Sequence, residues 1–444
     1  MTPLTGWGRY PRHASELITA ASPADLPSLM AAKSGFVARG NGRSYGDAAI
    51  GERITLCARG LNRIRAFDRA TGRVRVEAGV LLSDLLDVGV PRGFFPPVVP
   101  GTKFVTIGGM IAADVHGKNH HRDGGFGDHV EAFTLALPDG RVVSCSRGEN
   151  PELFAATIGG MGLTGTIVEA AFTLRPIETG WMRQTIHVAS DLEEAMKALR
   201  DSSASTYSVA WVDCLARGKA LGRSLIFAAE HATLRDLDAL RPGAPIFPSA
   251  KLGRLLVPFD LPSLTLNRLS VSAFNGLYFR AGAVKADYPH LVPWDPYFFP
   301  LDSIGNWNRI YGRRGFLQHQ CVVPTDHAPA VLAEILDRIS RRGTPSFLAV
   351  LKQLGPSHGD LSFPMEGFTL TLDLPVSDPA FALLDDLDRL VVEAGGRLYL
   401  AKDARQSPAT FEAGYPGLAR FKDVRQAIGA TGKISSHLST RLGI

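Results

Sequence analysis

One stretch, from Pro100 to His121, constrains this chain more than any other. It reads PGTKFVTIGGMIAADVHGKNHH, with a glycine pair, a run of small residues and then a polar cluster. Gly108 and Gly109 have no Cβ, so the backbone there can approach a flat or charged ligand closely. Thr106 can cap a short helix over the small residues, which leaves free N–H groups that face that ligand. A packed core alone does not require this arrangement.

Two further glycine-rich turns lie in the first 165 residues, and each adjoins a predicted strand. The first, Ala38 to Asp47, reads ARGNGRSYGD, and its glycines and serine can form an anion-binding nest beside Arg43. It matches neither GxGxxG nor the P-loop. The second, Gly159 to Gly165, reads GGMGLTG. An ordinary tight turn explains one such loop equally well, but the three together favour one extended dinucleotide.

Several side chains in and beyond the polar cluster can carry protons. His116, Lys118, His120 and His121 are spaced too closely for one helix face or a known zinc pattern, which disfavours a metal site. His116 and Lys402 are better candidates for acid–base or anion-binding work, because both can exchange a proton near neutral pH when partly buried. A solvated lysine at a strand end stays the alternative for Lys402.

Charge and cysteine content exclude some classes of protein. The net charge is +5 without a Lys/Arg patch, so a nucleic-acid module is poorly supported, although an anionic substrate or membrane surface is compatible. Cys57, Cys145, Cys214 and Cys321 are scattered, which predicts free thiols in a reducing compartment. Met1 to Arg12 lacks a signal-peptide core, and no run approaches the roughly 20 apolar residues of a spanning helix. We therefore expect a soluble or peripheral protein, cytoplasmic by default.

The periodicity of apolar residues predicts an α+β chain. The first part alternates short helical and strand-like runs, including a hairpin of Val130–Leu137 with Arg141–Cys145 around Pro138-Asp139-Gly140. From Trp181 onward, strands alternate with helices, which predicts a sheet with helices on one face. The strands are predicted at 182–188, 207–212, 318–323, 347–351 and 368–374, and the helices at 191–199, 328–341 and 379–394. The aromatic-rich segment from Phe274 to Phe299 is predicted to be irregular, as a loop over the core or a lipid-contacting flap.

These motifs carry a resemblance to known proteins. The three glycine-rich segments together resemble the vanillyl-alcohol-oxidase type of FAD flavoprotein. Within that superfamily, further motifs are similar to the family of decaprenylphosphoryl-β-D-ribose 2′-oxidases. They are GWGR at Gly6–Arg9, HGKNHH at His116–His121, PLDxxGxWN at Pro300–Asn308, FLQHQ at Phe316–Gln320 and LYLAKD at Leu398–Asp403. The likeness runs from Gly6 to the C-terminus.

The resemblance implies a two-domain α+β fold of the PCMH type. An FAD domain would comprise residues 1–178 and 397–444, and a substrate-binding cap domain with a mixed or antiparallel sheet, residues 179–396, would be inserted. The implied reaction is FAD-dependent oxidation of the ribose 2′-hydroxyl of polyprenylphosphoryl-β-D-ribose to a 2′-keto intermediate. This is the first half of the epimerisation that makes an arabinose donor for cell-envelope polysaccharide. A separate NAD(P)H-dependent short-chain reductase would complete it, and the enzyme would lie peripheral to the inner membrane, with the periplasmic face left open.

The resemblance also assigns the loops. Residues 38–48 would wrap the FAD pyrophosphate, and Tyr45 stands where covalent members of the superfamily carry a histidine, so FAD is expected to be held non-covalently. The expected cofactor contacts are Ala38, Arg39, Gly40, Asn41, Gly42, Arg43, Ser44, Tyr45, Gly46, Asp47, Gly101, Thr102, Thr106, Ile107, Gly108, Gly109, Ala113, Asp114, Val115, His116, Gly117, Ile167 and Tyr399. The expected substrate contacts are Lys118, Trp211, Phe298, Gln318, Gln320, Lys352, Thr371 and Lys402.

The candidate catalytic residues beside the isoalloxazine are Lys402, His116 and Tyr45. The sequence does not decide whether Lys402 or His116 handles the proton, and Lys402 can instead pair with the substrate phosphate. Thr371 and Phe298 stand where mycobacterial members carry a cysteine and a tyrosine, which leaves the chain length and the sugar open. Two alternatives remain: an oxidase of a soluble sugar, alditol or aldonolactone, and a flavin- or lipid-binding protein without turnover.

Overall fold

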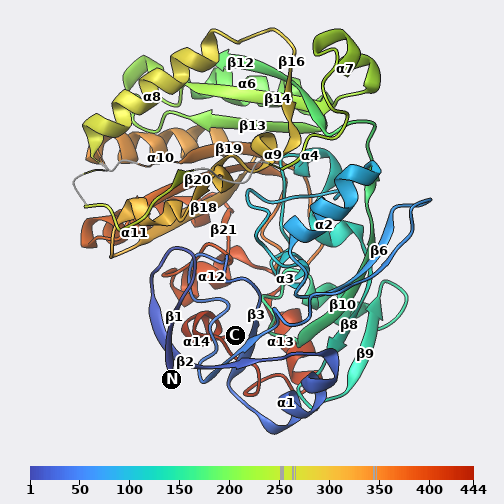
Figure 1. Cartoon of the computed structure of the whole chain (residues 1–444). Coiled ribbons are helices and arrows are strands. Elements are labelled where there is room, and N and C mark those ends of the chain that lie inside the picture. The colour runs from blue at the N-terminus through green and yellow to red at the C-terminus, as the bar shows by residue number, and fades with distance from the viewer. Residues whose placement is uncertain (251–254, 263–264, 266, 344–345, 347) are drawn as a thin grey trace.

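The computed structural model describes residues 1–250, 255–262, 265, 267–343, 346 and 348–444 (Figure 1). Its lower part holds both termini and two smaller sheets, and its upper part is built on one large sheet with helices against it. The predicted strand position 347 lies outside the described residues. Among the helices described, none is both long and apolar enough to cross a membrane.

The lower part contains a four-stranded and a five-stranded sheet. The four-stranded sheet has the order β1 (Thr2–Thr5), β2 (Arg12–Thr19), β4 (Ile54–Cys57) and β3 (Phe36–Arg39). The five-stranded sheet has the order β5 (Ile64–Phe67), β6 (Arg73–Glu77), β10 (Thr166–Thr173), β8 (Val130–Ala136) and β9 (Val142–Ser146). The predicted hairpin is confirmed, since β8 and β9 pair antiparallel. Helices α1 (Leu26–Ala32), α2 (Leu82–Gly89), α3 (Ile107–Ala112), α4 (His120–Asp123) and α5 (Pro151–Thr157) lie between these strands in the chain.

The three glycine-rich segments all adjoin these elements. The first follows β3, which pairs in parallel with β4. The second leads into α3, where the Thr106 hydroxyl accepts a hydrogen bond from the Gly109 N–H at 3.2 Å. That bond confirms the predicted cap. The third leads into β10. The two-stranded pairing of β7 (Phe94–Phe95) with β11 (Arg175–Pro176) lies near the passage to the upper part.

The upper part is built on an eight-stranded sheet in which every pair of neighbours is antiparallel. Its order is β16 (His290–Pro293), β12 (Trp181–Ala189), β14 (Ser224–His231), β13 (Tyr207–Val212), β19 (Ala349–Leu354), β20 (Gly367–Pro375), β18 (Phe316–Pro324) and β21 (Arg397–Leu398). The sequence prediction missed β14. A shorter pair joins β15 (Leu255–Leu256) to β17 (Ile304–Gly305).

Alternation along the strands separates the two faces of this sheet. Leu370 and Leu372 on β20 pack into an apolar core with helices α6 (Leu192–Asp201), α10 (Ala328–Arg342) and α11 (Asp378–Glu393). Thr369, Thr371 and Asp373 alternate with them and therefore point to the opposite face. The prediction of helices covering one face is confirmed for these three helices.

The prediction of an irregular segment from Phe274 to Phe299 is wrong. Its first ten residues lie in α8 (Arg268–Ala283), and nine more lie in β16 and α9 (Trp294–Phe298). The Asn267 side chain caps α8, accepting from the N–H groups of Leu269 at 2.8 Å and Ser270 at 3.1 Å. The helix persists because it is capped and because no proline interrupts it, while its aromatic residues find ring partners.

The C-terminal segment connects the two parts. After α7 (Leu234–Leu240) and α8 in the upper part, the chain ends with β21 at the edge of the large sheet and then three helices near the N-terminus (Figure 1). These are α12 (Pro408–Gly414), α13 (Leu418–Ala427) and α14 (His437–Leu442). The predicted return to the first domain therefore begins with a strand that hydrogen-bonds to β18 of the large sheet.

Candidate active site

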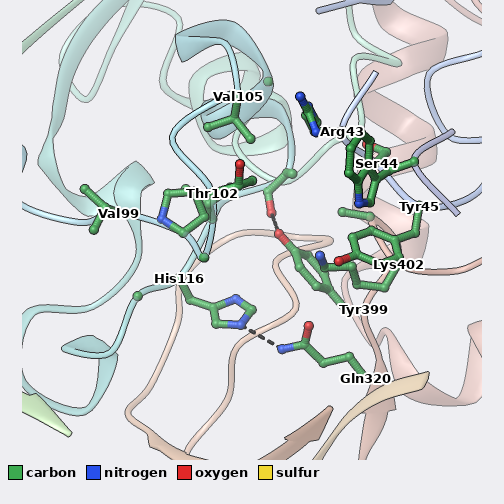
Figure 2. Close-up of a pocket in the computed structure, with 18 of the residues that line it drawn as sticks. Arg43, Ser44, Tyr45, Val99, Thr102, Val105, His116, Gln320, Tyr399 and Lys402 are labelled. Atoms are coloured by element: carbon green, nitrogen blue, oxygen red, sulfur yellow. Dashed lines mark hydrogen bonds between the residues drawn. The ribbon is translucent and has the colours of Figure 1, made fainter. Parts of the chain in front are cut away.

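A cavity of about 520 Å³ lies between the glycine-rich segments and the open face of the eight-stranded sheet. Its lower wall comes from all three glycine-rich segments, and its upper wall from β13, β18, β19 and β20. Figure 2 shows Arg43, Ser44 and Tyr45 on one side of it and Val99, Thr102 and Val105 on another. The glycines that line it are Gly40, Gly42, Gly101, Gly108, Gly109, Gly117, Gly162 and Gly165.

The lower wall is largely main chain. Gly101 lines the cavity, and a Cβ added there would meet no protein atom within 4 Å. A Cβ at Gly40 would collide with the Thr106 hydroxyl, so the first and second segments touch only because this residue is glycine. The Arg43 guanidinium lies 3.9 Å from the centroid of the Trp7 ring. This wall fits a long, flat, anionic group such as a dinucleotide.

Six of the predicted cofactor contacts do not line the cavity but support its wall. They are Arg39, Asn41, Gly46, Asp47, Ile107 and Asp114. Asn41 donates to the Phe104 carbonyl at 2.8 Å, which ties the first glycine segment to the second. Asp47 pairs with Arg441 on α14 at 2.9 Å, and Asp114 accepts from the Ser362 hydroxyl at 2.6 Å. The other predicted cofactor contacts line the cavity.

His116 is buried in the middle of the cavity wall. The Gln320 side-chain amide donates to His116 Nε2 at 2.9 Å, so the ring hydrogen of the neutral imidazole sits on Nδ1 (Figure 2). Burial, and then the charge of Lys352, lowers the pKa of His116 well below its usual value, so the ring is neutral. Nδ1 is buried and has no hydrogen-bond partner among the described residues. An unpaired buried donor at this place fits a bound group that carries an acceptor.

Three lysines with lowered pKa values line the same cavity. Burial lowers the pKa of Lys402 to about 7, against an opposing effect of Asp373 and with a further lowering by Lys352. Burial also lowers the pKa of Lys118 to about 7 and of Lys352 to about 8. Lys402 Nζ lies 3.8 Å from the centroid of the Tyr45 ring (Figure 2). An amine with such a pKa exists in both protonation states near neutral pH, which suits acid–base work.

Comparisons with known proteins agree with this arrangement. Residues 14–146 match the model of an FAD binding domain. The chain is 36% identical over 451 residues to the decaprenylphosphoryl-β-D-ribose oxidase of Mycolicibacterium smegmatis, covering 99% of this chain and 97% of that protein. The chain belongs to the decaprenylphosphoryl-β-D-ribose oxidase family. It is an FAD-dependent oxidoreductase with the predicted α+β fold.

Two other relatives set the family in context. An uncharacterized protein of Streptomyces coelicolor is 36% identical over 378 residues, covering 82% of this chain and all of that protein. The L-gulonolactone oxidase of Mus musculus is 28% identical over 162 residues, covering 36% of this chain and 37% of that protein. The likeness to the oxidase family therefore spans the cavity and both parts of the molecule, whereas the likeness to the lactone oxidase is limited to one portion.

Of the eight substrate contacts expected for this family, five come from the strands of the upper wall. Lys118, Trp211, Phe298, Gln318, Gln320, Lys352, Thr371 and Lys402 all line the cavity. Gln318, Gln320 and Thr371 project from the open face of the sheet, as their alternation with buried apolar residues requires. Phe298 is buried and packs 4.8 Å from Phe95, ring centroid to centroid, so it closes the side of the cavity.

Asp373 was missed by sequence reasoning. It is fully buried, accepts a hydrogen bond from the Gln318 side-chain amide and lies 3.5 Å from the Tyr311 hydroxyl. Burial raises the pKa of Asp373 to about 7, partly offset by these groups and by Lys402. The signal was present in the sequence, since Thr369, Thr371 and Asp373 form a polar alternation within an otherwise apolar strand.

The end of the cavity farthest from the glycine segments is apolar. Residues missed by the prediction line it, namely Val209, Phe227, Tyr278 and Val292, with Gln184 as the polar exception. The rings of Trp211 and Tyr278 lie 4.8 Å apart and join the sheet to α8. No sequence signal links these residues, because they come together only through the pairing of β12, β14 and β13.

Proposed function

We propose that this protein oxidises the 2′-hydroxyl of a polyprenylphosphoryl-β-D-ribose, with FAD as the hydride acceptor. The observation that carries the proposal is the order of surfaces along one cavity. A glycine-lined wall comes first, then the partly buried side chains of Lys118, Lys352 and Lys402, and then an apolar end. This order matches a dinucleotide, a phosphorylated sugar and a lipid chain.

The lysines favour an anionic substrate. None of the three forms an ion pair with a carboxylate in the described part of the chain, whereas Lys103 pairs with Asp295 and Lys197 with Asp201 elsewhere. Lys352 lowers the pKa of both Lys118 and Lys402, so its ammonium group repels each of the other two. A bound phosphate would relieve that repulsion. We propose that Lys118 and Lys352 recognise the phosphate.

Lys402 is the proposed base. Oxidation of the secondary alcohol removes a hydride and a proton, and bound FAD supplies the hydride acceptor. Lys402, with its pKa lowered to about 7, can accept the hydroxyl proton as a neutral amine. His116 is less suited, because its Nε2 already accepts from Gln320 and its pKa is far below neutral.

His116 and Tyr45 then position the reacting groups. With its hydrogen on Nδ1, neutral His116 can donate a hydrogen bond to the oxygen that loses its proton. Burial keeps the pKa of Tyr45 well above its usual value, so the ring stays neutral under the Lys402 amine and holds it in place. Because Tyr45 replaces the histidine of covalent relatives, we propose that FAD is held without a covalent bond, so acid precipitation of the holoenzyme should release it.

Partners follow from the chemistry of the product. A 2′-ketone must be reduced to give the epimer, and we propose a separate NAD(P)H-dependent short-chain reductase, since the GxGxxG of this chain, at Gly160–Gly165, leads into strand β10 and does not open a helix. A polyprenyl chain resides in a membrane, so we propose peripheral contact with the inner membrane. Both faces of that membrane stay open.

The second candidate is an oxidase of a soluble sugar or lactone. It is favoured by the partial likeness to L-gulonolactone oxidase.

The test is an anaerobic absorbance titration of the purified holoenzyme with polyprenylphosphoryl ribose, free ribose, alditols and aldonolactones. We expect the flavin absorbance to bleach with the lipid-linked substrate only. Bleaching with soluble compounds only would favour the second candidate, and bound flavin that no sugar reduces would favour a non-catalytic protein.

A further inference from the structure

The outward side of α8 carries large apolar side chains where a surface helix is normally polar. Leu269 is 82% exposed, Leu277 is 68% exposed and Val284, directly after the helix, is 84% exposed. Because an α-helix turns 100° per residue, these three positions, the apolar stripe, fall on one side of the helix, together with the exposed Ala273 and Ala281 and with the polar Ser270 and Arg280. A surface helix of a globular protein carries charged and polar residues on this side.

The opposite side of α8 anchors the helix on the large sheet. Val271 and Asn275 are buried, and the Asn275 amide donates to Asp213 Oδ1 at 2.7 Å. Phe279 packs against the cluster that contains Trp211 on β13. The apolar stripe is therefore not the packing face of the helix. Figure 1 places α8 at the outer edge of the upper part, away from both termini.

The helix also forms part of the cavity wall. Tyr278 lines the apolar end of the cavity and is 40% exposed, so this residue belongs to both the cavity and the surface beside the stripe. The cavity thus ends beneath α8, between the helix and the β12–β14–β13 part of the sheet. A lipid chain that leaves the cavity at this end emerges next to the apolar stripe.

The charges around the stripe are positive. α8 and the residues just after it carry Arg268, Arg280 and Lys285, all exposed, and no acidic side chain occurs from Arg268 to Ala286, while the next residue, Asp287, lies 3.4 Å from His187. Apolar residues flanked by exposed cations match an anionic lipid surface, where apolar side chains enter the interface and cations meet the head groups. A helix that faces water or another protein can carry acidic side chains, so their absence from α8 favours an anionic lipid surface.

From these observations we infer that α8 is a membrane-docking helix that binds an anionic lipid bilayer and sets the apolar end of the cavity against it. The inference rests on the proposed lipid-linked substrate, and it adds the surface through which that substrate is withdrawn. Leu269, Leu277 and Val284 enter the lipid interface, while Arg280 and Lys285 contact the head groups. The substrate's phosphorylated sugar then reaches the lysines while its polyprenyl chain stays partly in the membrane.

The test uses the full-length holoenzyme and vesicles that contain no substrate. Co-sedimentation is measured with phosphatidylcholine vesicles and with vesicles that also contain phosphatidylglycerol. We expect the natural protein to bind the anionic vesicles more strongly. The double variant Leu269→Ser, Leu277→Ser should bind them about tenfold or more weakly, because two apolar side chains no longer enter the interface. The matched control is Leu234→Ser, Leu240→Ser on α7, whose leucines are 44% and 46% exposed, and it should bind as the natural protein does.

A second readout separates docking from catalysis. Flavin bleaching by a short-chain, water-soluble polyprenylphosphoryl ribose should be unchanged in the α8 double variant, whereas bleaching by a long-chain substrate in vesicles should slow about tenfold. Equal vesicle binding by the double variant and the natural protein would overturn the inference. So would sedimentation velocity that shows a dimer lost in the double variant, because α8 would then be an interface between two copies. Failure of the short-chain substrate to bleach the natural protein would instead refute the proposed function.

Discussion

At the lower end of the cavity the wall is made of main chain, with Gly101, Gly108 and Gly109 leaving room beside it. At the upper end the wall is made of long side chains, with Lys352 and Lys402 entering from β19 and from the turn after β21. The two ends belong to one cavity, yet they differ in how they bind a ligand. Main chain without side chains accepts a flat ligand by shape, whereas partly buried amines act through charge and proton exchange. We therefore expect substitutions at the lower end to alter the affinity for FAD, and substitutions at the upper end to alter the rate of turnover.

The largest effect is expected from Lys402→Met. Removal of the proposed base should slow flavin reduction by on the order of 10²- to 10⁴-fold, while the FAD content stays normal. Anaerobic stopped-flow absorbance with saturating substrate measures this rate. Lys402→Arg should be just as slow, because a guanidinium keeps its proton. Lys422→Met, an exposed lysine on α13, is the matched control. A rate for Lys402→Met within a few-fold of the natural protein would assign the proton to another group.

A smaller effect, on binding rather than chemistry, is expected from Lys352→Met. Loss of one ammonium group facing the phosphate should raise KM about 10- to 100-fold, which corresponds to the free energy of a hydrogen bond to a charged group. The value of kcat should change less, and steady-state kinetics separate the two. Lys197→Met on α6, whose lysine pairs with Asp201 at the surface, should leave both constants unchanged. A fall in kcat at constant KM would contradict a role in phosphate recognition.

The lower end is tested by Gly101→Ala. Its Cβ would touch no protein atom within 4 Å, so folding should be unaffected, but the residue lines the cavity. We expect FAD to bind about tenfold more weakly, as for modest overpacking of a well-packed site. Flavin titration of the apoprotein gives the dissociation constant. Gly148→Ala is the control, because that Cβ also meets nothing within 4 Å and Gly148 does not line the cavity. Equal FAD affinity in the two variants would show that the second glycine segment is not part of the FAD site.

The smallest effect is a shift in pH dependence from Asp373→Asn. The Asp373 carboxylate raises the pKa of Lys402, so its loss should lower that pKa and move the pH profile of flavin reduction to lower pH. The asparagine keeps the size of the side chain, and its oxygen can still accept from Gln318 while its amide donates to the Tyr311 oxygen. An unchanged profile, or a shift to higher pH, would show that Asp373 does not act on Lys402.

The sequence was informative where function depends on backbone conformation. The short helix at Gly108 and Gly109 and its cap at Thr106 could be predicted, because both depend on residues that are neighbours in the sequence. The resemblance placed Lys352, Thr371 and Gln320 in the site, but periodicity alone could not, since β19, β20 and β18 meet only through long-range pairing. Asp373 was missed although its strand alternates. The helix α8 was not predicted, because its many aromatic residues suggested an irregular segment. Its cap at Asn267 and the absence of proline favour a helix.

The most direct test of the division between the two ends is the pH dependence of flavin reduction in a single anaerobic turnover. The substrate is polyprenylphosphoryl ribose at saturation, over a range of about pH 5.5 to 9. We predict a rate that rises with pH through about 7 and is constant above it, because Lys402 must lose its proton before it can accept one from the hydroxyl. The apparent pKa belongs to Lys402 together with Asp373. Lys402→Met should lose this rise while retaining bound FAD. A rate that does not change with pH in the natural protein, or a rise that persists in Lys402→Met, would contradict the account.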